Sequence, residues 1–75
     1  MAGTSDEWAN HAKRQLKAEL KRADVSYAEL ARRLTEIGLP ESEGSVTVKI
    51  NRGAFPAWFL FAVMKAIGVQ TLRLD

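Results

Sequence analysis

Residues 26–38 read SYAELARRLTEIG and give the clearest prediction of local structure in the chain. Ser26 is suited to cap a helix, and Glu29 three residues later completes the pattern of a capping box. Apolar side chains recur at helical spacing and predict one buried face, formed by Tyr27, Leu30, Ala31, Leu34 and Ile37. Gly38 can adopt the positive φ that commonly ends a helix. We therefore expect a helix over about Tyr27–Ile37.

The segment before this helix predicts a longer one, over about Asp6–Ala23. Thr4 and Glu7 have the spacing of a capping box. Apolar residues recur at every fourth position and are expected to face the core: Trp8, Ala12, Leu16 and Leu20. Basic side chains gather between residues 13 and 22, and the simplest interpretation of such a cluster is a solvated face.

A third helix is expected over about Glu43–Arg52, between a Ser42 cap and Gly53. Val46 and Ile50 lie one turn apart and are expected to point inward. Several residues of this helix are mediocre helix formers, so tertiary packing must hold it in place. With the two apolar residues inward, the outward face carries Ser45, Val48 and Arg52, and its flanks carry Thr47, Lys49 and Asn51.

A fourth helix is expected to start at Pro56 and to end before Gly68. It is apolar nearly all round, and such a helix is usually buried or covered by something. We expect its core face to consist of Leu60, Val63, Met64 and Ile67. The tail at residues 69–74 alternates near its end and predicts a short extended segment.

Apolar side chains in excess of one core predict self-association. They are Trp58 and Phe61 on the far side of the fourth helix, with Leu72 and Leu74 in the tail. Exposed tryptophan is often an interface residue, and the tail could pair as an edge strand. A second interpretation of Trp58 is a lid over the tail.

Length and composition restrict the function. The 75 residues suffice for one domain, residues 1–75, which we expect to be compact and all-α. There is no cysteine and only one histidine, so we expect no disulfide, metal or other cofactor. Neither a catalytic triad nor a glycine-rich phosphate loop can be assembled, so we expect no enzyme and no small-molecule substrate. With no signal peptide or membrane segment in the pattern, we expect a cytoplasmic location.

Three motifs together resemble the lambda-repressor-like (XRE-type) helix-turn-helix family. They are SYAELA at residues 26–31, KINRG at 49–53 and AIGV at 66–69. The spacing from Tyr27 to Val69 is most similar to a small bacterial domain of unknown function of that type, and the resemblance covers about residues 8–74. One departure is the turn from Gly38 to Ser42, which is longer than the usual tight turn. The resemblance implies a four-helix helix-turn-helix domain and transcriptional regulation through binding of double-stranded DNA.

In such a domain the third helix enters the major groove and its outward side chains contact bases. Arginine or lysine pairs with guanine, asparagine pairs with adenine, and a methyl group can touch the thymine methyl. Phosphate contacts are expected from Lys17, Lys21, Arg32 and Arg33. Because one such module buries little surface, a homodimer is expected.

Three alternatives stay open. The third helix and the basic residues can form a solvated surface of a structural bundle. The domain can also be a protein-interaction module that uses the same fold through its fourth helix and tail without binding DNA. RNA binding has less support, because the chain lacks an aromatic-rich sheet on which bases stack.

Overall fold

The computed structural model describes residues 4–72. It contains the α-helices α1 (Ser5–Ala23), α2 (Tyr27–Glu36), α3 (Glu43–Arg52) and α4 (Ala57–Ile67). Within residues 4–72 there is no strand, so the all-α prediction is confirmed. The predicted extended tail is only partly described: residues 69–72 are in neither helix nor strand, and residues 73 and 74 lie outside the described part. None of the four described helices is long and apolar enough to cross a membrane.

Side-chain caps start the first three helices where the sequence predicted them. At α1 the capping box is complete: the Glu7 amide donates to Thr4 Oγ1 at 3.1 Å, and the Thr4 amide donates to Glu7 Oε1 at 2.7 Å. At α2 the Glu29 amide donates to Ser26 Oγ at 3.1 Å. The Glu29 carboxylate does not return to Ser26, however, because it binds two arginines of its own helix. The predicted box at α2 is therefore half formed.

The end of α3 lies against the backbone of α1. Gly53 terminates α3 with φ 64°, a left-handed conformation that glycine adopts without steric cost. A Cβ atom placed on Gly53 would lie 1.9 Å from the carbonyl oxygen of Ala9. Glycine is therefore required here both by the turn and by the close approach of the two chains.

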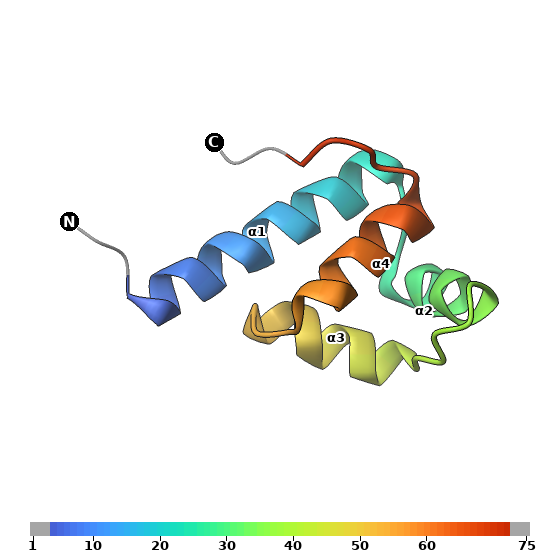
Figure 1. Cartoon of the computed structure of the whole chain (residues 1–75), viewed down its shortest axis with the longest axis horizontal. Helices are drawn as coiled ribbons and strands as arrows, with labels where there is room; N and C mark the ends of the chain where they lie inside the picture. The colour runs from blue at the N-terminus through green and yellow to red at the C-terminus, as the bar shows by residue number, and fades with distance from the viewer. Residues whose placement is uncertain (1–3, 73–75) are drawn as a thin grey trace.

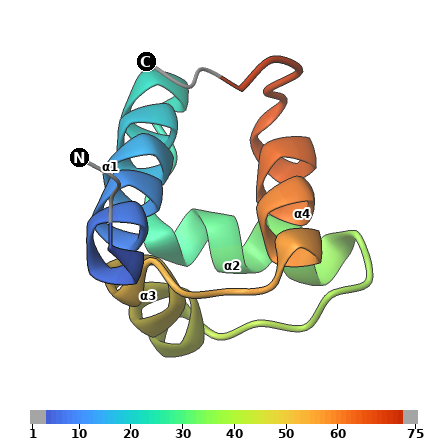
Figure 2. The same cartoon turned by 60° about the vertical axis from the view of Figure 1, so that its left-hand side comes forward.

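The core forms where α2 crosses the other helices. Helix α2 packs against α3 and α4, and α3 packs against α1. Figure 2 shows α1 and α4 on opposite sides of the molecule, with α2 crossing between them. The largest fully buried side chains come from all four helices: Leu16, Leu30, Leu34, Val46, Ile50, Phe59 and Val63.

The predicted core face of α1 is wrong at Trp8, which is 60% exposed. An α-helix turns by about 100° per residue, so positions four apart drift by about 40° at each step. Leu16 and Leu20 are buried, Ala12 is half-buried, and Trp8 has rotated out to the surface. A stripe with a strict spacing of four cannot remain on the core over this length.

Two further core predictions are corrected. Phe59 is fully buried on α4, whereas Leu60, which was expected at the core, is only partly buried. Because the helix is apolar nearly all round, its sequence does not indicate which face turns inward. Ile37 is exposed rather than buried, because α2 ends at Glu36 and Ile37 is the cap residue that leaves the helix.

Candidate nucleic-acid interface

Helix α3 is held by two buried side chains and exposes the opposite side. Val46 and Ile50 are fully buried, and Val48, between them in the sequence, is 49% exposed. The exposed surface opposite the two anchors, called the outer face of α3 from here on, consists of Gly44, Val48, Asn51 and Arg52. The predicted orientation of this helix about its axis is therefore correct for Val48, Asn51 and Arg52.

Ser45 and Lys49 are bound within the chain by Glu41. The Ser45 hydroxyl donates to Glu41 Oε1 at 2.7 Å, and Lys49 Nζ donates to Glu41 Oε2 at 2.7 Å. Lys49 Nζ also lies 5.2 Å from the centre of the Phe59 ring, in a cation–π contact. Both residues are partly buried and are less available for base contacts than the sequence suggested.

Glu41 is a residue that sequence reasoning missed. Its side chain is only 7% exposed. Burial by itself raises the pKa of this carboxyl, but the hydrogen bonds from Lys49 and Ser45 together outweigh it and leave the pKa below its usual range. Glu41 is therefore ionised at neutral pH and neutralises Lys49. No local pattern in the sequence indicated this role, because Glu41 precedes α3 and reaches Ser45 and Lys49 only through the conformation of the turn before the helix.

Thr47 also uses its polar group inside the chain. Its hydroxyl donates to the backbone oxygen of Glu43 at 2.7 Å. Among the described residues, Asn51 and Arg52 have no such partner. The free polar side chains of the outer face are therefore one amide and one guanidinium group.

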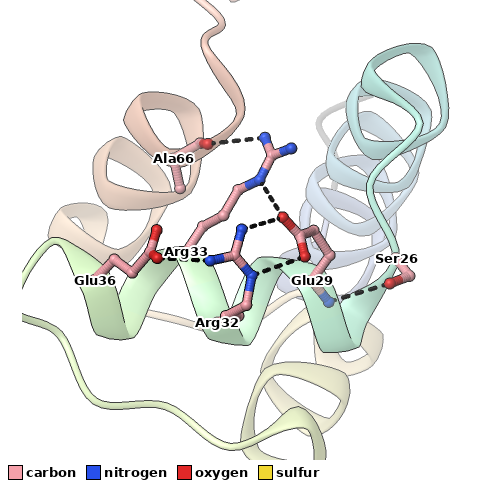
Figure 3. Close-up of polar contacts among 6 residues, drawn as sticks. All are labelled: Ser26, Glu29, Arg32, Arg33, Glu36 and Ala66. Carbon is pink, nitrogen blue, oxygen red and sulfur yellow. Dashed lines mark hydrogen bonds and ion pairs between the residues drawn. The ribbon is translucent and has the colours of Figure 1, made fainter.

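The two arginines predicted to hold phosphates form an ion-pair cluster along α2 (Figure 3). Arg32 donates to both carboxylate oxygens of Glu29, at 3.0 and 2.6 Å, and to Glu36 at 2.6 Å. Arg33 donates to Glu29 at 2.8 Å and to the backbone oxygen of Ala66 at 3.2 Å, which joins α2 to the last turn of α4. Two positive and two negative side chains make the cluster neutral.

The hydrogen bonds and ion pairs of this cluster stabilise the charged forms of its side chains. Hydrogen bonds from Arg32 and then from Arg33 lower the pKa of Glu29 from 4.5 to about 2. The pKa of Arg32 is raised in turn, chiefly by its hydrogen bond to Glu29. A phosphate group would have to compete with these carboxylates for either arginine.

The lysines predicted to hold phosphates lie away from α3. Lys17 and Lys21 are exposed and border an open hollow with Ser26 and Tyr27, where α1 ends and α2 begins. Figure 1 shows the C-terminal half of α1 at the edge of the molecule opposite α3. The structure therefore does not bring these lysines to the outer face.

An apolar groove of about 220 Å³ separates α1 from α4. It is lined by Trp8, His11, Ala12, Gln15, Leu16, Phe55, Leu60 and Leu72. The Trp8 and His11 rings meet edge to face, with their centres 5.7 Å apart. Leu72, one of the residues predicted for self-association, contributes to this groove, whereas Leu74 lies outside the described residues.

Trp58 and Phe61 lie one turn apart on α4 and are 54% and 68% exposed. The prediction that they face away from the core is therefore confirmed. The Trp58 ring makes a T-shaped contact with the ring of the buried Phe59, with the ring centres 6.3 Å apart. Self-association through these two residues remains a prediction.

These features define a small all-α domain whose third helix is anchored on one side and exposed on the other. The model of the family described as a domain of unknown function (DUF6471) matches residues 8–72, and the chain belongs to this family. Neither the curated proteins nor the solved structures compared with the chain contain a match. The family match does not identify the chain as lambda-repressor-like, so that assignment remains a prediction.

Proposed function

We propose that the chain is a sequence-specific DNA-binding domain of a bacterial transcriptional regulator, in which α2 and α3 form a helix-turn-helix unit. The observation that carries the proposal is the outer face of α3. Val46 and Ile50 are fully buried beneath it, while Val48, Asn51 and Arg52 are exposed. An apolar side chain, an amide and a guanidinium group are the chemistries that recognise base edges in the major groove.

The composition of the outer face supports a role other than helix stability. Glycine, valine and asparagine are weaker helix formers than alanine, glutamate or lysine. Gly44, Val48 and Asn51 nevertheless occupy exposed positions, where packing does not select them. Gly44 would let the start of α3 approach a duplex closely, because it has no side chain. We therefore infer that contact with a ligand, rather than folding, selects these residues.

The proposed DNA-binding surface carries little net charge. Lys49 is neutralised by Glu41, and the α2 cluster is neutral as a whole. Arg52 is left as the unpaired cation on the outer face, within the described residues. A single module also buries little surface on DNA, so the proposed regulator acts as a homodimer.

The test is selection of bound sequences from a library of random duplexes, followed by titration in salt with the selected and a scrambled duplex. The selected duplex should bind more tightly, and Arg52→Ala should weaken its binding by about 1–3 kcal/mol. Arg14→Ala is the matched control, because Arg14 is also exposed but lies on α1. Absence of binding to any duplex at low salt would refute the proposal.

The second candidate function is self-association through α4, with or without DNA. Trp58 and Phe61 are adjacent exposed aromatic residues, and such patches commonly mark interfaces. Sedimentation velocity at micromolar concentration should show a dimer for the wild type and more monomer for Phe61→Ala. If both proteins are monomeric over the whole concentration range, this candidate is wrong.

A further inference from the structure

We propose that α3 reads a thymine next to an adenine, with Val48 contacting the thymine methyl group and Asn51 pairing with the adenine; this inference rests on the DNA-binding function proposed above. It names the bases that the outer face selects. Three properties of α3 support it: which of its side chains are free, how these are spaced along the helix, and which base edge each can recognise.

Three of the six α3 side chains that the sequence predicted for base recognition are already hydrogen-bonded within the chain. Ser45 and Lys49 donate to the carboxylate of Glu41, each at 2.7 Å. Thr47 donates to the backbone oxygen of Glu43 at 2.7 Å. A base edge could engage these groups only after breaking a contact that the folded chain already makes. Val48, Asn51 and Arg52 are the members that remain exposed and unengaged.

The spacing of Val48 and Asn51 matches neighbouring base pairs. Val48 lies midway between the buried anchors Val46 and Ile50, so its side chain points away from the core. Asn51 is three residues later, about 4.5 Å further along the helix axis and on the same side. Successive bases on a strand are about 3.4 Å apart along the duplex axis. One side chain can therefore face one base pair while the other faces the next.

The chemistry of the two side chains then selects the bases. Valine has no hydrogen-bonding group, and the thymine methyl is the apolar feature of the major groove. Guanine or cytosine opposite Val48 would lose water from its polar edge without gaining a partner, which costs affinity. The amide of Asn51 can donate to N7 and accept from N6 of adenine in one plane, which no other base allows in the same geometry.

The experiment places modified bases in the duplex obtained by selection. Replacing thymine by uracil removes the methyl group alone, and replacing adenine by 7-deazaadenine removes the N7 acceptor alone. For the wild type, one uracil position should weaken binding about fourfold, the value of one buried methyl group. One 7-deazaadenine position next to it should weaken binding about fivefold, the value of one hydrogen bond.

Variants assign each effect to its residue. Val48→Ala should bind the thymine and uracil duplexes equally, and Asn51→Ala should bind the adenine and 7-deazaadenine duplexes equally. Ile37→Ala and Asn10→Ala are the matched controls, since each removes an exposed side chain of the same kind outside α3, and both should retain the sensitivity of the wild type. Unchanged thermal unfolding of all four variants verifies that folding is intact.

The outcomes separate this inference from the proposed function. If the wild type binds its selected duplex but no uracil or 7-deazaadenine position weakens binding, the inference is overturned while DNA binding stands. If Val48→Ala keeps the sensitivity to uracil, Val48 does not read thymine and the inference is also overturned. If no duplex is bound at all, both proposals fail. If Val48→Ala loses only the sensitivity to uracil, and Asn51→Ala loses only the sensitivity to 7-deazaadenine, each base is assigned to its residue.

Discussion

Replacing Gly53 by alanine tests the contact on which the placement of α3 against α1 depends. Gly53 has φ 64°, and an added Cβ would lie 1.9 Å from the Ala9 carbonyl oxygen and 2.7 Å from its carbon. Real Cβ atoms essentially never approach another atom more closely than 3.0 Å. The two backbone segments would therefore have to separate by about 1.1 Å, because neither neighbour is a flexible side chain.

Two costs add up in this variant. The left-handed conformation costs a residue with a Cβ atom about 1–2 kcal/mol. Forcing extra atoms into a packed contact costs about 1–3 kcal/mol more. The free energy of unfolding should fall by about 2–5 kcal/mol in total. For a domain of this size, 1 kcal/mol corresponds to about 4–8 °C, so the melting temperature should fall by at least about 8 °C.

The assay is thermal and urea denaturation followed by circular dichroism, with Gly68→Ala as the matched control. Gly68 ends α4 with φ 76°, and nothing lies within 4 Å of a Cβ placed there. That variant should lose only the conformational part, about 1–2 kcal/mol. The difference between the two variants measures the contact with α1. Equal destabilisation of both variants would refute the close approach of α3 to Ala9.

Three more predictions concern stability. Ser26→Ala should reduce the free energy of unfolding by about 1 kcal/mol, because the Glu29 amide loses its cap; an unchanged denaturation midpoint would contradict this. Since the pKa of Glu29 falls from 4.5 to about 2 on folding, its contribution to stability is complete above about pH 4.5 and disappears as the pH approaches 2. Melting temperatures between pH 5 and pH 2 should therefore fall less steeply for Glu29→Gln than for the wild type, and parallel curves would be the contrary result. Phe59→Ala should cost about 3–5 kcal/mol in a urea titration, because Phe59 is fully buried. The exposed Phe61, replaced in the same way, should change stability by no more than about 0.5 kcal/mol, and similar losses for both would show that the face of α4 is assigned wrongly.

The helices could be predicted because their limits depend on neighbouring residues. Thr4, Ser26 and Ser42 each accept a hydrogen bond from an amide three residues later, and Gly38 takes the positive φ that its position required. Such interactions are visible as short sequence patterns. The number, order and approximate bounds of the helices therefore followed from the sequence.

The packing of the helices was harder to predict, because it depends on residues far apart in the chain. The contact between Gly53 and Ala9 joins positions more than forty residues apart, and no local pattern indicates it. The exposed position of Trp8 follows from helical drift, which the spacing of four concealed. Phe59 was missed because α4 offers apolar side chains in every direction.

The candidate site was predicted in outline and refined in detail. The anchors Val46 and Ile50 fixed the side of α3 that is exposed, since their spacing left one choice. The sequence could not show that Glu41, in the preceding turn, would bind Ser45 and Lys49. A carboxylate that folds back onto a helix is recognised only when the conformation of the turn is known.

The contacts of Glu41 have a consequence for how members of this family could diverge. The carboxylate holds one serine and one lysine of α3 from a position outside that helix. Losing it in a single mutational step would release a hydroxyl and an ammonium group beside Val48 and add one positive charge to the surface. A descendant could thus acquire a different preference for its ligand while inheriting α3 unaltered. Variation at position 41 is therefore the place where changes of specificity should be sought first when related chains are compared.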